Sequence, residues 1–300
     1  MLTIFSIPKA FIGHIGVIQT NAIRSWLELE PKCEIILFGD DEGTSKAASE
    51  LGVSHMPGIR CNEFGTPLIS DAFEKAQQFS NNSLLCYTNA DIILTNDLMA
   101  AIKKVRFQEF LMVGQRWDYD LNNHLDFQDI EWERRLLDDV LDKGNRHPPA
   151  GSDYFVFPRG SQNGFPELAV GRAGWDCWLI YNNRRKGIPV IDASCAVTIV
   201  HQNHDYSHVP QRRLGEWNAG EDVTNINAIG GWDHVFTLLD ATHVLTSKYL
   251  LPALRIKHLR RRWQTIPVLF PKIGPISRSI HQGITAIVIK LKQCIKQLGN

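Results

Sequence analysis

The chain has no acidic residue after Asp240, although its 32 basic and 32 acidic side chains give a formal net charge of zero. Residues 241–300 carry eleven Lys and Arg, which leaves 21 basic and 32 acidic side chains in residues 1–240. The neutral total is therefore the sum of a part with charge −11 and a tail with charge +11. Such an asymmetry between segments is typical of an interaction tail.

Other absences exclude several classes of protein. No apolar run approaches the roughly 18 residues that a membrane span needs, and Met1–Ile7 lacks the basic start and the cleavage site of a signal peptide. The six Cys form no Cys-x-x-Cys pair, which indicates reduced thiols in a cytoplasmic protein rather than a disulfide scaffold. Gly13-His14-Ile15-Gly16 is not a dinucleotide fingerprint, and no P-loop or Gly-x-Ser-x-Gly motif is present.

Residues 1–200 alternate short β-rich runs with helical stretches, the pattern of an α/β sheet. The expected strands cover residues 2–7, 34–38, 53–56, 84–88, 110–114, 154–157 and 198–201. The expected helices cover residues 19–29, 43–51, 68–79, 131–143 and 174–186.

Polar residues follow three of the expected strands. The first strand runs into Pro8-Lys9, the second into Gly39-Asp40-Asp41 and the central one into Asn89-Ala90-Asp91. Since the carboxyl ends of parallel strands line the crevice where open α/β sheets bind ligands, we expect these segments to line one pocket. Each Asp also has a structural interpretation, because Asp after a strand often caps the next helix.

Four segments carry a resemblance to a known family. They are Phe38-Gly39-Asp40-Asp41, Tyr87-Thr88-Asn89-Ala90-Asp91-Ile92-Ile93, Gly171-Arg172-Ala173-Gly174-Trp175-Asp176 and His201-Gln202-Asn203-His204-Asp205. In this order, residues 1–205 resemble the nucleotide-sugar transferases of GT-A fold. The resemblance implies an α/β fold with a Rossmann-like mixed or parallel sheet flanked by helices. We therefore expect residues 1–240 to form a catalytic domain and residues 241–300 a basic helical extension.

The family's Asp-x-Asp motif holds a divalent cation against the nucleotide diphosphate, and its counterpart here is Asn89-Ala90-Asp91. The resemblance implies Mn²⁺ or Mg²⁺ as cofactor, with Asp91 and His201 as metal ligands. Such a cation stabilises the negative charge of a diphosphate leaving group. Asn89 offers a neutral oxygen or a contact to ribose. His201, His204 and His208 leave a zinc site as an alternative, although no Cys lies near them, and a purely structural role as another.

A catalytic base is also implied by the resemblance. Asp176 follows the Gly/Trp-rich segment that precedes the catalytic acid in many inverting members, where a carboxylate removes the proton of the acceptor hydroxyl. Asp153, which we expect on the acceptor side, is the second candidate base. The alternative for Asp176 is a helix N-cap beside buried Trp residues.

Further residues are assigned to the donor through the resemblance. Lys9 and Arg24 are expected to contact the diphosphate, and Arg172 either forms a bidentate fork with it or pairs with surface carboxylates. Trp175 either stacks on a sugar ring or fills the core. The complete predicted nucleotide-sugar site comprises Pro8, Lys9, Arg24, Asp40, Asp41, Thr66, Asn89, Ala90, Arg172 and Trp175.

The basic tail predicts a partner of its own. Apolar residues recur at helical spacing over residues 276–298, with most of the Lys and Arg on the opposite side. A basic amphipathic helix without acidic residues suits an anionic membrane surface, which we expect residues 255–298 to contact. The alternative is that the helix packs against the catalytic domain or a second subunit in a homodimer. Nucleic acid is not an expected partner, because no recognised binding module accompanies the charge.

Together these features predict a cytoplasmic glycosyltransferase, peripheral on the membrane. The reaction would move a sugar, a hexose above all, from a nucleoside-diphosphate donor to a glycan or lipid-linked acceptor in polysaccharide biosynthesis, with inversion. One alternative is a non-catalytic relative that binds nucleotide sugar or carbohydrate and docks on membranes. The other is a sugar nucleotidyltransferase, although the Gly-rich opening loop expected there is absent.

Overall fold

A computed structural model describes residues 1–204 and 220–272 of the chain. It divides the chain into two compact units, Met1–Ala253 and Leu254–Asn300. The predicted boundary after Asp240 differs from this division. Residues 243–252 form two strands of the large sheet, and their backbone pairing makes them part of the first unit.

The first half of the sheet is parallel. Strand β1 pairs with β2 and β4, and β2 pairs with β3, all in parallel register. The strands are β1 (Leu2–Ser6), β2 (Glu34–Phe38), β3 (Ser54–Met56) and β4 (Leu84–Thr88). The helices that connect them are α1 (Gly13–Leu27), α2 (Thr44–Leu51) and α3 (Ile69–Phe79). All four strands and all three helices overlap the elements expected from the sequence.

The second half of the sheet is mixed. The strand order is β12-β11-β9-β6-β8-β4-β1-β2-β3, in which β8 is antiparallel to both β4 and β6. These further strands are β6 (Leu111–Tyr119), β8 (Ser152–Pro158), β9 (Val190–Cys195), β11 (His243–Thr246) and β12 (Leu250–Pro252). The structure thus confirms a mixed, mostly parallel α/β sheet.

Strand β6 bends at Gly114 and joins a second, smaller ladder. Its register with β8 shifts between Val113 and Gln115, and a Cβ at position 114 would lie 2.7 Å from Tyr154 Oη. Beyond the bend β6 pairs with two short strands, one of which also pairs with β5. The short strands are β5 (Ile92–Ile93), β7 (Asn145–Arg146) and β10 (Ile199–Gln202).

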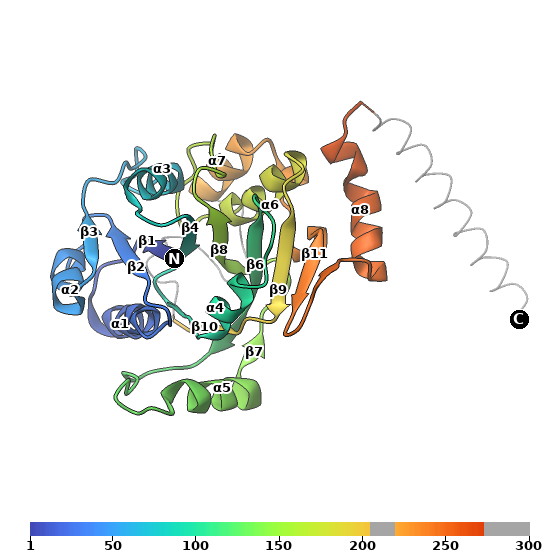
Figure 1. The fold of residues 1–300 in the computed structure, drawn as a ribbon. Helices are drawn as coiled ribbons and strands as arrows, with labels where there is room; N and C mark the ends of the chain where they lie inside the picture. Colours follow the sequence, from blue (N-terminus) through green and yellow to red (C-terminus); the bar gives the residue numbers. More distant parts are fainter. Residues whose placement is uncertain (205–219, 273–300) are drawn as a thin grey trace, which may run out of the picture. The chain divides into compact units, whose positions relative to one another are not determined.

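Helices cover both faces of the sheet (Figure 1). The face toward α1 is mainly aliphatic, with Ile4 and Trp26 fully buried in it. The opposite face is aromatic: Phe5 lies 5.1 Å from Phe73 of α3, measured between ring centroids. The alternation of Ile4 and Phe5 along β1 follows from the two-residue period of a strand. The remaining helices are α4 (Asp97–Ile102), α5 (Trp132–Lys143), α6 (Trp175–Arg185), α7 (Glu221–Ala228), α8 (Ile256–Leu269) and the 3-10 turns Trp232–His234 and Leu238–Asp240.

The carboxyl-terminal unit contains α8 among its described residues. The amphipathic helix predicted over residues 276–298 lies outside the described part of the chain. None of the helices in the described ranges is long and apolar enough to cross a bilayer.

Candidate active site

The carboxyl end of β4 meets β10 at the edge of the sheet. After β4 the chain passes through Asn89-Ala90-Asp91 into β5, which pairs antiparallel with β10 so that His201 lies opposite Ile92. The Gln202 side chain fixes this arrangement, because its Nε2 donates to the carbonyl oxygens of Ile18 and Asp91. Two segments about a hundred residues apart are thereby placed side by side.

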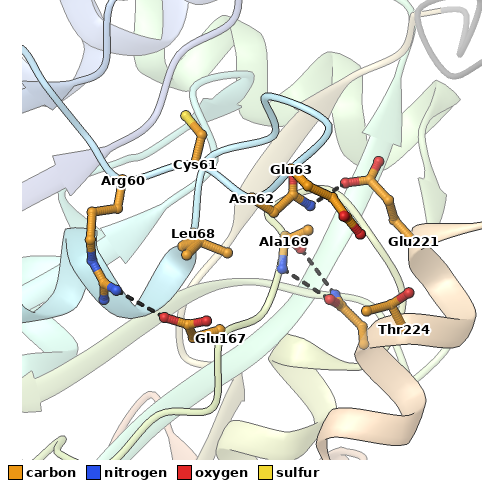
Figure 2. A pocket seen from close by; sticks show the side chains of 10 residues that line it. Arg60, Cys61, Asn62, Glu63, Leu68, Glu167, Ala169, Glu221 and Thr224 are labelled. Atoms are coloured by element: carbon orange, nitrogen blue, oxygen red, sulfur yellow. Dashed lines mark hydrogen bonds and ion pairs between the residues drawn. The ribbon is translucent and has the colours of Figure 1, made fainter.

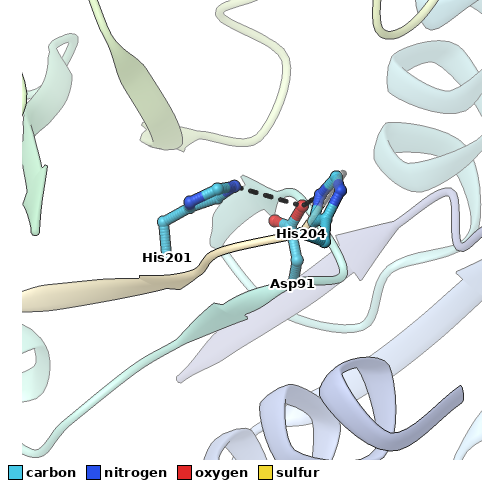
Figure 3. Close-up of side chains that lie close together, drawn as sticks. All are labelled: Asp91, His201 and His204. Atoms are coloured by element: carbon cyan, nitrogen blue, oxygen red, sulfur yellow. Dashed lines mark hydrogen bonds and ion pairs between the residues drawn. The ribbon is translucent and has the colours of Figure 1, made fainter. Parts of the chain in front are cut away.

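Asp91, His201 and His204 form a compact cluster (Figure 3). Asp91 Oδ2 lies 3.1 Å from His204 Nε2 and 3.7 Å from His201 Nε2. The three side chains are only 15%, 6% and 3% exposed for Asp91, His201 and His204. The other carboxylate oxygen, Asp91 Oδ1, is buried and has no hydrogen-bond partner among the described residues. A buried oxygen of this kind is costly unless another group binds it.

Charges around Asp91 keep its carboxylate ionised. Burial acts to raise the pKa of Asp91, but His201, His204 and Lys9 hold it well below its usual range. Lys9 lies in the loop after β1, where its backbone N–H donates to Gln19 Oε1 and its carbonyl accepts from Gln19 Nε2. Lys9 therefore adds positive charge near Asp91.

The cluster has the composition of a divalent-metal site. One carboxylate and two imidazoles present donor atoms that all lie within 4.8 Å of one another. Imidazole suits zinc and other transition metals, whereas Mg²⁺ prefers a shell made of oxygen atoms. The sequence predicted Asp91 and His201 as ligands, and the structure adds His204, which the sequence analysis had considered only for zinc.

Asp118 faces the far side of His201. His201 Nδ1 lies 3.3 Å from Asp118 Oδ1, at an angle outside that of a hydrogen bond. Asp118 also accepts hydrogen bonds from Arg116 Nε at 2.8 Å and interacts with His147 Nδ1 at 2.7 Å. Burial acts to raise the pKa of Asp118, but these neighbours hold it far below its usual range. A carboxylate behind a histidine is a common arrangement at metal sites, where it orients the ring.

Asn89 and Asp153 lie opposite each other because β8 runs antiparallel to β4. Asn89 Nδ2 donates to Asp153 Oδ1 at 2.8 Å, and Arg116 Nη1 donates to Asp153 Oδ2 at 2.9 Å. Both carboxylate oxygens of Asp153 are thus engaged by donors, and its side chain is only 9% exposed. This environment is unfavourable for a catalytic base that must approach an acceptor hydroxyl.

Asp176 lies in the first turn of α6 and has a different environment. Burial raises the pKa of Asp176 to about 6, and the charge of Asp153 contributes to the rise. Burial, and after it the negative charges of Asp91, Asp153 and Asp176, raise the pKa of Tyr87. A carboxylate with a raised pKa near other acidic groups is a typical candidate for acid–base chemistry.

Trp175 belongs to the aromatic core. Its ring lies 5.1 Å from Tyr87 and 5.2 Å from Phe155, measured between centroids, and the residue is 5% exposed. The predicted stacking on a sugar ring therefore does not describe this side chain. The alternative interpretation, that Trp175 fills the core, fits the contacts.

Arg172 and Thr66 meet at Glu221. Arg172 donates through Nε to Glu221 Oε2 at 2.8 Å, and Asn62 Nδ2 donates to Glu221 Oε1 at 2.6 Å. Burial acts to raise the pKa of Glu221, but Asn62, Thr66 and Arg172 hold it below its usual value. Arg172 is thus paired with a carboxylate, the alternative to the predicted fork on a diphosphate.

Glu221 lines a shallow depression of about 440 Å³, together with Arg60, Asn62 and Glu167 (Figure 2). Three of its charged groups form ion pairs, because Arg60 binds Asp71 and Glu167 while Glu221 binds Arg172. The depression does not include Asp91, His201 or His204.

Of the remaining predicted donor residues, all but Arg24 and Thr66 directly follow strands at the sheet edge. Asp40 and Asp41 follow β2 and line a second depression of about 680 Å³, where Asp40 accepts a hydrogen bond from the Gly58 N–H. Burial raises the pKa of Asp41. Pro8 and Ala90 directly follow β1 and β4. Arg24 is exposed in the last turn of α1, which runs back toward the amino ends of the strands, away from this edge.

The chain was compared with protein families, with curated proteins and with solved structures. No protein-family profile matches the sequence, and no curated protein matches it. Its structure is similar to the mannosyltransferase of Pyrobaculum calidifontis in complex with GDP-Man and Mn²⁺, with 14% identity and a TM-score of 0.42 over 69% of this chain. The match spans 58% of the mannosyltransferase, less than two thirds of its length.

It is also similar to glucosyl-3-phosphoglycerate synthase from Mycobacterium tuberculosis, solved with Mn²⁺, UDP and phosphoglyceric acid. That pair has 13% identity and a TM-score of 0.46, and the match covers 77% of this chain and 79% of the synthase.

Proposed function

We propose that the chain is a glycosyltransferase that uses a nucleoside-diphosphate sugar and a divalent cation held by Asp91, His201 and His204. The observation that carries the proposal is the buried Oδ1 of an ionised Asp91, which lies beside two imidazoles and has no hydrogen-bond partner within residues 1–204 and 220–272. This group lies at the carboxyl edge of the sheet, where α/β folds bind ligands, and Lys9 adds a second positive charge there.

The residues at this edge divide into a donor side and an acceptor side. When bound, the cation would neutralise charge on the diphosphate as the sugar–phosphate bond breaks. Lys9 would pair with a phosphate oxygen. Asp176 would accept the proton of the acceptor hydroxyl, which makes that oxygen the nucleophile. We favour Asp176 over Asp153 because the two oxygens of Asp153 already accept hydrogen bonds from Asn89 and Arg116.

A thermal-shift experiment tests this proposal. UDP, GDP, ADP and dTDP are each added with and without Mn²⁺, and one nucleotide is expected to raise the melting temperature only when Mn²⁺ is present. Ligand that binds the folded state alone shifts the unfolding equilibrium by mass action. The corresponding nucleotide sugar should then be hydrolysed slowly without acceptor, which a protein that only binds it would not do. The absence of a shift with every nucleotide would contradict the proposal.

We further propose that the chain after Ala253 docks on an anionic membrane. In its described part, Leu254, Ile256 and Leu259 are 61%, 85% and 47% exposed. Arg255, Lys257 and Arg260 alternate with these apolar side chains and are also exposed. Exposed apolar and basic side chains together are typical of helices that bind the interface of anionic bilayers.

Co-sedimentation with phosphatidylserine-containing liposomes measures this binding. Ile256→Glu is expected to reduce the bound fraction several-fold, because it removes an apolar contact and adds a negative charge. Gln264→Glu adds the same charge at an exposed polar position of α8 and is expected to reduce binding less. Equal binding of the wild type to neutral and anionic liposomes, or equal losses in both variants, would contradict membrane docking through this surface.

A further inference from the structure

A chain of polar contacts joins Asn89 to the metal-binding histidine. Asn89 Nδ2 donates to Asp153 Oδ1, and Arg116 Nη1 donates to Asp153 Oδ2. Arg116 Nε donates to Asp118 Oδ1, which lies 3.3 Å from His201 Nδ1. The intermediate side chains are shielded from solvent, with Asp153, Arg116 and Asp118 only 9%, 13% and 22% exposed. Contacts among shielded charges are stronger than the same contacts in water.

The hydrogen bonds of Asn89 require an amide at this position. Its Oδ1 accepts from the Tyr87 hydroxyl at 3.2 Å, while its Nδ2 is the donor to Asp153 at 2.8 Å. A carboxylate has no N–H to donate. Aspartate at position 89 would instead bring two negatively charged oxygens within 2.8 Å of each other, and the pairing of β4 with β8 would keep them there.

Arg116 connects Asp153 with Asp118. Its guanidinium binds Asp153 through Nη1 and Asp118 through Nε, so one rigid planar group connects the two carboxylates. Asp118 in turn faces Nδ1 of His201, which leaves Nε2 directed at Asp91. A displacement of Asp153 would therefore shift Arg116 and, through it, the Asp118 carboxylate that faces His201 Nδ1 at 3.3 Å.

We infer that Asn89 is a positioning residue that maintains the cation site through Asp153, Arg116 and Asp118, and that it does not itself bind the cation. This inference rests on the proposed function, because it concerns the same cation site. It assigns the amide in the Asn-x-Asp motif a role of its own. Replacing Asn89 by aspartate is accordingly expected to weaken cation binding at this site.

Mn²⁺ binding to the protein without nucleotide tests the inference, with free Mn²⁺ measured by electron paramagnetic resonance. Asn89→Asp is expected to weaken Mn²⁺ affinity about tenfold or more, the range seen when groups behind a metal ligand are changed, and to lower the melting temperature of the metal-free protein. The double variant Asn89→Asp/Asp153→Asn restores one donor and one acceptor with the polarity reversed. The double variant should regain much of the Mn²⁺ affinity and much of the melting temperature that Asn89→Asp loses.

Asn81→Asp is the matched control. Asn81 Nδ2 donates to Glu34 Oε1 at 2.9 Å, an amide–carboxylate pair of the same kind at an exposed position of the fold. Asn81→Asp should leave Mn²⁺ affinity unchanged. If the wild type binds Mn²⁺ and Asn89→Asp binds it equally or more tightly, or if the double variant recovers nothing, the inference is wrong. If the wild type binds no Mn²⁺, the proposed function itself fails at the metal site.

Discussion

Asp91→Ala is expected to remove the Mn²⁺-dependent thermal shift and to lower the rate of sugar transfer by on the order of 10³. Asp91 supplies the only carboxylate of the proposed cation site in the described part of the chain, and its Oδ1 is unpartnered among the described residues. Without this carboxylate, the imidazoles of His201 and His204 would remain near Lys9 with no negatively charged ligand beside them.

Asp91→Ala needs a control that separates the loss of a metal ligand from a change in the stability of the fold. Asp138→Ala removes a carboxylate that is 68% exposed on α5, and it should leave both the thermal shift and the transfer rate unchanged. Asp91→Asn keeps the size of the side chain and should lose activity like Asp91→Ala. Retention of a Mn²⁺-dependent shift in Asp91→Ala, with an unchanged circular dichroism spectrum, would contradict the assignment of the ligand.

Asp176→Asn is expected to lose activity and gain stability at the same time. Loss of a general base costs about 10²–10⁴ in rate, because the acceptor hydroxyl then keeps its proton as the sugar is transferred. Asp176 titrates in the folded protein with a pKa of about 6, above its ordinary value of 3.8. In the wild type, kcat/KM should fall about tenfold per pH unit below pH 6, as this carboxylate becomes protonated.

The sign of the stability effect follows from the same pKa. The folded protein binds the Asp176 proton more tightly than the unfolded chain does. The folded protein is therefore progressively destabilised as the pH rises from 3.8 to about 6 and Asp176 ionises. Above pH 6 the buried, ionised carboxylate lowers the free energy of unfolding by the full amount, roughly 2–3 kcal/mol. Asp176→Asn removes that cost, so denaturant unfolding at pH 8 should show a more stable variant and unfolding at pH 4 a much smaller difference. If Asp176→Asn remains active, Asp176 is not the base. If Asp176→Asn is inactive but less stable than the wild type at pH 8, the burial that raises the pKa of Asp176 is contradicted.

Local sequence signals were sufficient for the parallel half of the sheet. Glu34–Phe38 and Leu84–Thr88 are predicted to the residue, because each is an apolar run that ends at polar or glycine residues. Strand β9 was not predicted, since Asp192 and Ser194 interrupt its apolar character. Likewise β6 continues beyond the predicted end at Gly114, through polar residues that pair with β10.

The candidate site was predictable only where a motif identifies it. Asp91 and His201 followed from the resemblance, and the structure places them together. Asp118 and Arg116 were not predicted, because their roles depend on β6 running past Gly114 and meeting β10, which is distant in the sequence. The alternation of polar and aromatic residues in Gln115-Arg116-Trp117-Asp118-Tyr119 was the available signal for a strand with one face toward a polar site.

Contacts between distant segments also determine where the residues assigned to the donor lie. Arg172 was expected either at the diphosphate or at a carboxylate, and its partner Glu221 lies on α7, a helix that the sequence analysis did not identify. The ring of Trp175 packs against Tyr87 and Phe155, contacts that fit the interpretation that it fills the core. Pairings between distant segments, rather than local propensity, determine these outcomes.

The central claim is that Asp91, His201 and His204 hold the cation, and electron spin echo envelope modulation of bound Mn²⁺ tests it most directly. This measurement detects nitrogen nuclei that are coordinated to the ion. We expect couplings from two imidazole nitrogens, reduced to one in His204→Ala and in His201→Ala. Bound Mn²⁺ without nitrogen coupling, or couplings that both single variants leave unchanged, would contradict the account.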